Sequence, residues 1–249
     1  MSTAAAGPVR LCHLYPDHLN IYADRGNIAV FQRRLEWRGL VLEVAEVGLG
    51  DPIPADCHLY YLGGGQDRDQ KLVAEDLAQK ADPLRQAAVD GAVVLGVCGG
   101  YQLLGHCYAT ADGQMVPGIG LLDVETTTGP SRLIGDVVLE VTLGGHTHTV
   151  VGYENHAGRT HLGGGCTPLG RLRRGHGNNG ADGCEGAVAA RTVGTYLHGP
   201  LLPKNPWLAD TLLGWALDHA GCPVELAPLD DHLEQAAHAV AQTRAGQKR

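Results

Sequence analysis

The stretch that decides the fold is Leu95-Gly96-Val97-Cys98-Gly99-Gly100-Tyr101-Gln102. The apolar run Ala92–Val97 predicts a buried strand, and the residues from Gly99 to about Cys107 predict a short helix. A cysteine between two glycines at such a strand-to-helix turn is typical of a nucleophile elbow. The flanking glycines avoid Cβ clashes, so the thiol can project above the sheet. Cys98 is therefore our candidate nucleophile, and the alternative is a buried cysteine in a glycine-rich turn.

Strand and helix patterns alternate before this elbow. Strands are expected at Val9–Leu14, Val41–Val47 and Cys57–Leu62. Helices are expected at Asn27–Trp37, where apolar residues repeat on one helical face, and at about Asp69–Val89. Alternation at this spacing predicts βαβ units, and therefore an α/β fold with a mostly parallel sheet covered by helices on both faces.

The second half of the chain changes character. Glycine-rich turns separate strand-like runs at Leu121–Thr127, Arg132–Leu143, His146–Tyr153 and Val188–Thr195. These runs predict added antiparallel strands that flank or extend the sheet. Long loops are expected within Gly163–Gly183, and further helices at Trp207–His219 and Leu229–Thr243.

Composition and charge exclude several classes of protein. The chain has 249 residues, with 19 Lys and Arg against 27 Asp and Glu, and a net charge of −8. Such an acidic chain lacks the basic surface of a nucleic-acid binder. No apolar run approaches the ~20 residues of a membrane span, and residues 1–9 do not resemble a secretion signal. We expect a cytoplasmic protein of one domain, residues 1–249, with frayed ends at about 1–8 and 244–249.

The seven cysteines contain no Cys-x-x-Cys pair, so neither a disulfide framework nor a structural zinc site is expected. Apart from Cys98, we expect most of them to be small buried hydrophobic residues. His146 and His148 share one face of a predicted strand, as metal ligands can. Because no third ligand is nearby in the sequence, the surface interpretation is favoured and no metal is expected.

A cysteine nucleophile needs a general base, and the chain offers 13 histidines. His198 follows the strand-like run Val193–Leu197 and precedes the turn Gly199-Pro200. The carboxyl ends of strands in an open parallel sheet border the ligand crevice, so His198 can meet Cys98 there. Gly63-Gly64-Gly65 also ends a strand on that side, and it either supplies an oxyanion donor or forms a flexible loop.

Several motifs together carry a resemblance. The elbow, the glycines at 63–65 and Gly194-Thr195-Tyr196-Leu197-His198-Gly199-Pro200 resemble class I glutamine amidotransferases of the cobyric-acid-synthase-like branch. Four more motifs narrow the resemblance to the GatD-like glutaminase subunits of lipid II isoglutaminyl synthases. They are Asn20-Ile21-Tyr22-Ala23-Asp24-Arg25-Gly26-Asn27, Arg132-Leu133-Ile134-Gly135-Asp136, Gly152-Tyr153-Glu154-Asn155-His156-Ala157-Gly158-Arg159-Thr160 and Leu202-Pro203-Lys204-Asn205. The resemblance extends from about Arg10 to Thr243 and implies a flavodoxin-like fold.

The resemblance implies roles in a covalent reaction. Cys98 would attack the side-chain amide carbon of L-glutamine, while His198 acts as general base and then protonates the departing ammonia. Water would hydrolyse the resulting γ-glutamyl thioester to glutamate.

The resemblance also implies which residues bind the substrate. Backbone N–H groups of Gly64 or Gly65, with that of Gly99, would hold the oxyanion. Arg132 would pair with the α-carboxylate of glutamine through its planar fork. Gln102, on the first helical turn after the nucleophile, is a further candidate for substrate contact.

One position departs from the usual pattern. Many class I amidotransferases carry an acid two residues beyond the catalytic histidine, where this chain has Pro200. The residue that orients His198 is therefore open. Asp24 is the first acid to test, and the alternative is that it forms a turn or cap at Asp24-Arg25-Gly26.

A partner follows from the same resemblance. It implies a heterodimer with a Mur-ligase-like synthetase subunit of the MurT type, which would use ATP and Mg²⁺ to activate the D-glutamate of the lipid II stem peptide. This chain has neither a P-loop nor a G-x-G-x-x-G pattern after a strand, so no cofactor is expected on it. Lipid II would be reached through the partner.

Three other functions stay open at this point. A related amidotransferase can feed another acceptor such as a corrin-like acid, although those enzymes usually carry a synthetase domain on the same chain. The 249 residues do not hold that domain beside this one. A stand-alone hydrolase of γ-glutamyl compounds needs no partner. A catalytically silent subunit would bind a partner or metabolite through this fold, which the presence of Cys98 and His198 argues against.

Overall fold

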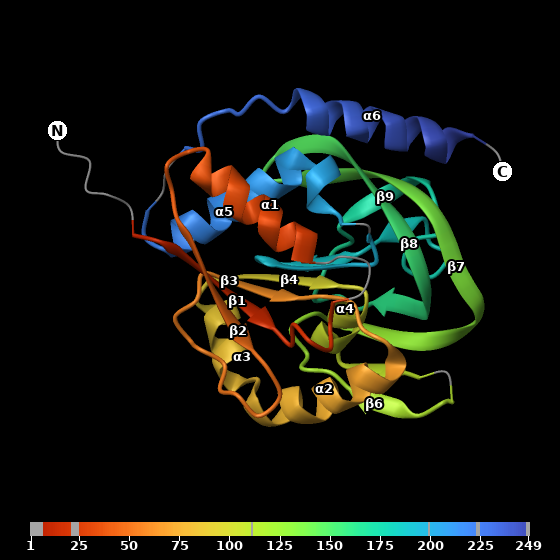
Figure 1. Ribbon diagram of the computed structural model, residues 1–249. Coiled ribbons are helices and arrows are strands. Elements are labelled where there is room, and N and C mark those ends of the chain that lie inside the picture. Colours follow the sequence, from red (N-terminus) through yellow and green to blue (C-terminus); the bar gives the residue numbers. More distant parts are fainter. Residues whose placement is uncertain (1–6, 21–24, 111, 199, 223–224, 248–249) are drawn as a thin grey trace.

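A central sheet of parallel strands brings the elbow to one edge of the molecule. The computed structural model describes residues 7–20, 25–110, 112–198, 200–222 and 225–247 (Figure 1). The sheet has the order β11-β12-β4-β3-β1-β2. Its strands are β1 Val9–Leu14, β2 Leu42–Val47, β3 Leu59–Leu62, β4 Val93–Val97, β11 Ala187–Ala189 and β12 Thr192–Thr195. Only β11 runs antiparallel, and the other neighbours are parallel. The order β2-β1-β3-β4-β12 is that of a flavodoxin-like sheet.

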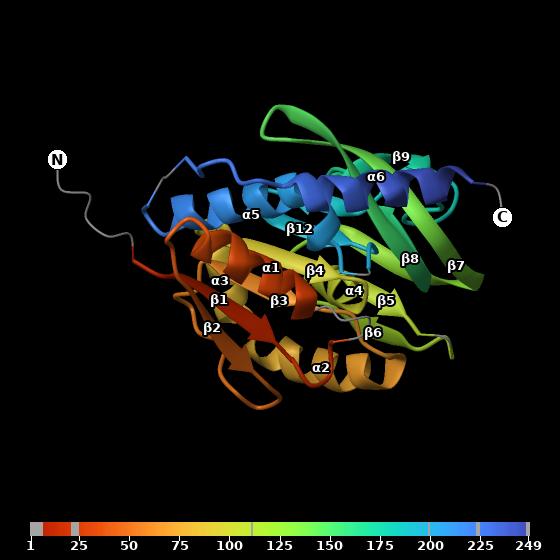
Figure 2. The ribbon, with the colours of Figure 1, turned by 45° about the horizontal axis from the view of Figure 1, so that its top comes forward.

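Helices cover both faces of this sheet, as the sequence predicted. Figures 1 and 2 show α1 (Arg25–Glu36) and α5 (Pro206–His219) on one face, with α2 (Asp67–Lys80) and α3 (Asp82–Val89) on the other. The apolar stripe of α1 is buried against the sheet through Ile28, Phe31 and Leu35. Helix α4 (Gly99–Leu104) starts directly after β4. The predicted α/β fold with a mostly parallel sheet is confirmed.

The added strands form a second sheet. Its order is β10-β9-β7-β5-β6, with β8 paired to β7. Its strands are β5 Cys107–Ala109, β6 Met115–Pro117, β7 Val124–Leu143, β8 His146–Leu162, β9 Gly170–Arg174 and β10 Cys184–Glu185. The two strands predicted at Leu121–Thr127 and Arg132–Leu143 are one strand, β7. A register shift between Thr128 and Leu133 absorbs the Gly129-Pro130 segment, because a bulge accommodates a proline that cannot donate to the ladder.

Two other expectations about elements were wrong. The single helix at Asp69–Val89 is two helices, α2 and α3, because Pro83 at the start of α3 cannot continue a preceding helix. The strand at Val188–Thr195 is a hairpin of β11 and β12, which turns at Ala190 with φ 49°. The region Gly163–Gly183, where long loops were expected, also contains the short strand β9.

The C-terminal helix α6 (His232–Gly246) lies outside the helical layer and crosses the long β7–β8 hairpin (Figure 2). None of its residues is buried.

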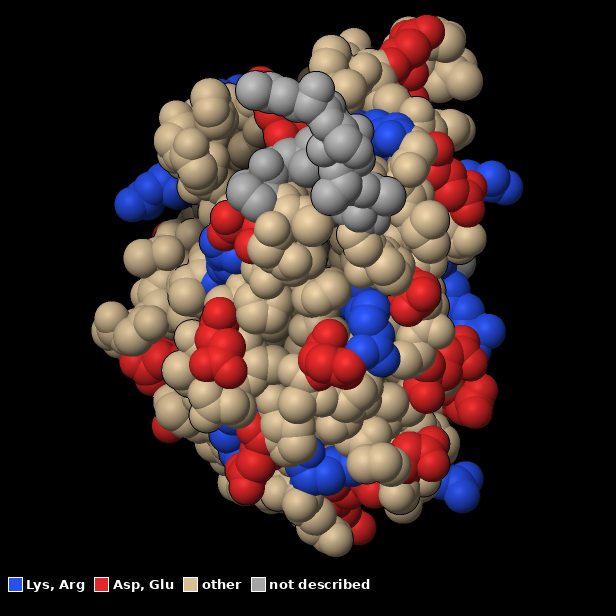
Figure 3. Space-filling view, turned by 90° about the vertical axis from the view of Figure 1, so that its left-hand side faces the viewer, with Lys and Arg blue, Asp and Glu red and all other residues tan. Residues whose placement is uncertain are grey.

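Among the described residues, no helix is both long and apolar enough to cross a membrane. Acidic and basic side chains are interspersed over the face in Figure 3, in keeping with the moderate negative charge of the chain.

All seven cysteines are free thiols. Only Cys12 and Cys57 are buried, and the other five, Cys98 included, are partly exposed. The expectation that most of the others are buried was therefore wrong. Cys107 and Cys184 lie in short strands of the second sheet, β5 and β10.

Candidate active site

Cys98 occupies a strained turn between β4 and α4. Its backbone has φ 52° and ψ −103°, a conformation that non-glycine residues rarely adopt and that is typical of a nucleophile elbow. A Cβ atom on Gly100 would lie 2.4 Å from the carbonyl oxygen of Leu62, and one on Gly96 would lie 2.6 Å from Leu104 Cδ1. Glycine at both positions therefore lets α4 begin this close to the sheet.

The glycine loop after β3 lies against the elbow. The Gly100 N–H donates a hydrogen bond of 3.0 Å to the Gly63 carbonyl oxygen and so anchors α4 to this loop. A Cβ atom on Gly99 would lie only 3.1 Å from the backbone nitrogen of Gly65. The backbones of Gly65 and Gly99 are thus adjacent, and Gly64 and Gly65 line the cavity in front of Cys98. This arrangement allows two amides to reach one oxyanion.

His198 is held by its backbone at the junction of the two sheets. Its N–H donates to the Tyr153 carbonyl oxygen at 2.8 Å, and the Tyr153 N–H donates to the His198 carbonyl oxygen at 3.3 Å. Tyr153 lies on β8 of the second sheet, whereas His198 follows β12 of the first. The histidine is 1% exposed and lines the same cavity as Cys98.

One cavity of about 520 Å³ brings the predicted residues together. That volume is typical of a site for a small molecule. Of the predicted residues, it is lined by Gly64, Gly65, Cys98, Gln102, Arg132 and His198. Asp24 lies outside the described residues, so the structure says nothing of the acid predicted there.

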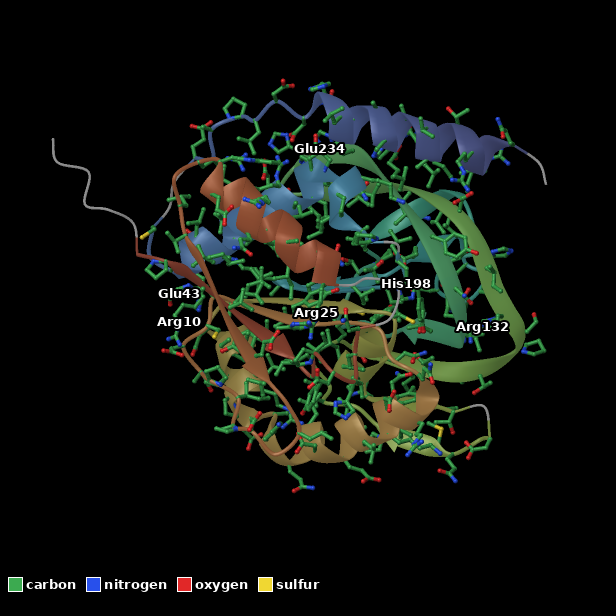
Figure 4. The ribbon with its side chains drawn as sticks, viewed as in Figure 1. Arg10, Arg25, Glu43, Arg132, His198 and Glu234 are labelled. Carbon is green, nitrogen blue, oxygen red and sulfur yellow. The ribbon has the colours of Figure 1, made fainter. Side chains whose placement is uncertain are left out.

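Arg132 reaches the cavity from β7, across the site from the central sheet (Figure 4). Its Nε donates to Asn155 Oδ1 at 2.7 Å and its Nη2 donates to the Asn155 carbonyl oxygen at 2.6 Å. The Nε edge of the guanidinium fork is therefore held by β8. A carboxylate in the cavity would meet the Nη1–Nη2 edge, which keeps the planar geometry that a bidentate pair needs.

Gln102 takes part in a buried polar network. Its Oε1 accepts from Gln70 Nε2 at 2.9 Å, and its Nε2 donates to the Tyr196 hydroxyl at 3.2 Å. The Tyr196 hydroxyl also lies 2.6 Å from Thr160 Oγ1, which is 2.7 Å from Thr126 Oγ1. Gln102 thus lines the cavity, but both ends of its amide are already engaged by protein groups. Contact with the substrate would have to use the second proton of Nε2.

The sequence reasoning missed His156 and Asn155, which also line the cavity. His156 is buried and stacks on the Tyr196 ring with centroids 3.6 Å apart. Its Nδ1 lies 2.9 Å from the Gly158 carbonyl oxygen, so that nitrogen carries a proton. No apolar alternation marks these positions in the sequence, because the buried positions of β8 after Tyr153 are Glu154, His156, Gly158 and Thr160. The strand nevertheless continues well past its predicted end.

Glu154 lies beneath His156 and is completely buried. Its oxygens accept from the His176 N–H and Nδ1–H, both at 2.7 Å, and from the Gly177 N–H at 2.8 Å. Burial favours the neutral acid, but the nearby His156 ring, whose Nε2 lies 3.9 Å away, and the hydrogen bonds from His176 and these amides outweigh it and lower the pKa of Glu154. Glu154 is therefore an ionised group that stabilises the wall of the cavity on the side of β8.

His146 and His148 are surface residues. Both are exposed on β8, and His148 stacks on the Trp207 ring with centroids 4.3 Å apart. Within the described part of the chain, no group of three or more His, Cys, Asp or Glu side chains has metal-binding geometry.

The sequence matches a known domain family over most of its length. The CobB/CobQ-like glutamine amidotransferase domain matches residues 10–206. The glutamine-hydrolysing subunit GatD of lipid II isoglutaminyl synthase from Staphylococcus aureus is 40% identical over 238 residues, which are 95% of this chain and 96% of that protein. The Streptococcus pneumoniae GatD subunit is 35% identical over 91% of this chain and 88% of that protein. The cobyric acid synthase of Pelotomaculum thermopropionicum is 34% identical, and its match covers 86% of this chain but 41% of that protein.

Solved structures share the fold at low sequence identity. A chain of PurLQS from Thermotoga maritima superposes with a TM-score of 0.56 at 18% identity, covering 86% of this chain and 97% of that chain. A glutamine amidotransferase from the same organism gives a TM-score of 0.53 at 15% identity, covering 95% and 94%. Both share the overall fold of this chain.

Proposed function

The chain belongs to the CobB/CobQ-like glutamine amidotransferase family, and we propose that it is the glutamine-hydrolysing subunit of a lipid II isoglutaminyl synthase. The observation that carries this proposal is the single cavity that Cys98, His198 and Arg132 line together. The GatD relatives, which match over nearly their whole length, favour this synthase over cobyric acid synthase, which matches over 41% of its length.

The chemistry begins with the thiol of Cys98. Its sulfur attacks the side-chain amide carbon of L-glutamine, and the carbonyl oxygen becomes an oxyanion that accepts hydrogen bonds from the amides of Gly65 and Gly99. His198 takes the thiol proton and transfers it to the amide nitrogen, so that the C–N bond breaks and ammonia leaves. Water, deprotonated by His198, then hydrolyses the thioester and regenerates the thiol.

Substrate recognition uses the opposite wall of the cavity. Arg132 pairs with the α-carboxylate of glutamine, and Asn155 holds the guanidinium in the required plane. Gln102 is held by Gln70 and Tyr196 and supports the floor of the site between these walls.

The amidation itself requires a second protein. A Mur-ligase-like synthetase subunit of the MurT type would bind ATP and Mg²⁺, activate the α-carboxylate of the stem-peptide D-glutamate of lipid II, and receive ammonia from this chain. Ammonia is mostly protonated at neutral pH and then lacks a nucleophilic lone pair, so a closed route between the two sites keeps it reactive. We place the complex in the cytoplasm, where reducing conditions suit seven free thiols.

An amidation assay tests this proposal. The isolated chain with L-glutamine, ATP and lipid II should form no D-isoglutamine, and addition of the synthetase subunit should restore amidation. In the complex, Cys98→Ala should abolish amidation from glutamine, while added ammonium salt restores it. Cys107→Ser, which changes another partly exposed thiol, is the matched control and should behave as the wild type.

Two outcomes would contradict the proposal. Amidation by the isolated chain would show that it is not a subunit that depends on a partner. Normal glutamate release by folded Cys98→Ala would show that this thiol is not the nucleophile.

A further inference from the structure

A buried carboxyl group lies behind the segment that carries His198. This segment, Thr195 to His198, begins at the last residue of β12 and ends at the backbone pair with Tyr153. Glu185 comes from β10 of the second sheet and is completely buried. It does not line the cavity that contains Cys98.

Where the β12 ladder ends, the Glu185 carboxyl accepts hydrogen bonds from the last residue of the strand and from the residue that follows it in the chain. Its Oε1 accepts from the Tyr196 N–H at 2.6 Å. The Thr195 hydroxyl lies 3.1 Å from Oε1 and 3.0 Å from Oε2 of the same carboxyl, and it accepts from the Leu197 N–H at 3.1 Å. The next amide, that of His198, donates to Tyr153. Each amide from Tyr196 to His198 therefore has an acceptor, and Glu185 supports the first two directly or through Thr195.

This support matters because buried backbone amides need acceptors, and the parallel ladder no longer provides them after Thr195. Without the carboxyl, the segment would lose its fixed path between β12 and β8, and the imidazole of His198 would lose its fixed position. A displacement of about 1 Å in a catalytic group can reduce a rate about a hundredfold.

We infer that Glu185 is a positioning residue for His198: its carboxyl holds Thr195 and Tyr196 so that the imidazole points into the cavity that contains Cys98. The inference rests on the proposed glutaminase function and extends it to a residue outside the cavity. Burial also raises the pKa of Glu185 to about 8. At neutral pH the group is therefore mostly the neutral acid, which places no uncompensated charge beside the segment.

The test compares Glu185→Ala with Glu185→Gln in the complex with the synthetase subunit. Glutamate release is measured as kcat per folded chain, with the folded fraction taken from urea unfolding. Glu185→Gln keeps a carbonyl oxygen that can accept from Tyr196, so its kcat should stay within about fivefold of the wild type. Glu185→Ala should lower kcat about 10- to 100-fold with KM within about twofold, because the Arg132 contact is untouched.

Two further variants complete the design. Asp76→Asn is the control, since Asp76 is a partly buried carboxylate of α2 that accepts from the Tyr15 hydroxyl. It should leave kcat unchanged. Thr195→Val removes the hydroxyl between Glu185 and the Leu197 amide and should lower kcat with KM unchanged; it keeps the test decisive if Glu185→Ala does not fold.

Several results would overturn the inference. One is wild-type kcat per folded chain in Glu185→Ala or in Thr195→Val, and another is a loss in Glu185→Gln as large as that in Glu185→Ala. These results, against an active wild-type complex, leave the proposed function standing. A wild-type complex that hydrolyses no glutamine overturns the proposed function and this inference with it.

Discussion

The backbone N–H of Cys98 donates a hydrogen bond of 2.8 Å to the carbonyl oxygen of Thr195. Thr195 ends β12, which pairs in parallel with β4, the strand that leads into the elbow. One rigid ladder therefore sets the separation between the nucleophile and the start of the segment that carries His198. Because the ladder belongs to the buried core, this separation does not depend on loop conformation.

Replacement of His198 tests the assignment of the general base. His198→Gln should lower kcat/KM for glutamine hydrolysis by about 10²- to 10⁴-fold, because proton transfer to and from the reacting groups is lost. Glutamate release by the purified complex measures the effect. His146→Gln, which changes an exposed histidine on β8, should have no effect. If the two variants had similar activity, the base would have to be another histidine.

Replacement of Arg132 tests the carboxylate site. Arg132→Ala should lower kcat/KM about 30-fold or more, mainly through KM, because a charged partner of the substrate is removed. Arg132→Lys should recover only part of the loss, since an ammonium cannot form the planar bidentate pair. Arg33→Ala on α1 is the control for loss of an exposed charge. Alkylation of Cys98 by iodoacetamide should stay at the wild-type rate, and a slower reaction would indicate a structural role for Arg132.

The close packing of α4 against β3 predicts an effect on stability. Gly100→Ala should lower the free energy of unfolding by about 1–3 kcal/mol, because the added Cβ would lie 2.4 Å from the Leu62 carbonyl oxygen. Gly135→Ala is the matched control, since a Cβ there has no neighbour within 4 Å. Urea unfolding measures both variants. Equal stability of the two would mean that the elbow is less tightly packed than these contacts require.

The raised pKa of Glu185 predicts a pH dependence of stability. Its pKa rises from 4.5 to about 8 because burial disfavours the charged form. Between these values the folded chain keeps a proton that the unfolded chain has released. The free energy of unfolding should therefore fall as the pH rises through this window, by up to about 1.4 kcal/mol per pH unit from this group.

Glu185→Gln cannot titrate, so this contribution should disappear. Urea unfolding of both proteins at about pH 5, 6 and 7 should show a shallower slope for the variant. Other titrating groups, such as the buried His13, are common to both proteins and cancel in the difference. Identical slopes would show that Glu185 titrates alike in the folded and unfolded chains.

Much of the fold was predictable because its signals are local. The apolar stripe of α1 repeats with the helical period, and the apolar run of β4, Val93–Val97, has no polar interruption. The break between α2 and α3 was also predictable from the sequence, since Pro83 lies inside the predicted helix. The length of the β7–β8 hairpin could not be predicted from the sequence, because cross-strand pairing stabilises polar residues that have little strand preference of their own.

The sequence by itself determined the elbow. Gly96, Cys98 and Gly100 directly follow an apolar run, and this local pattern predicts a strand that meets a helix at Cys98. Only the tertiary structure decided how His198 is held, since Tyr153 supports it from the other sheet and Glu185 lies behind its segment. Glu185 stands in a short, polar stretch with no periodicity, and its importance comes from burial between two sheets. Burial of this kind depends on where distant segments meet, which no local pattern encodes.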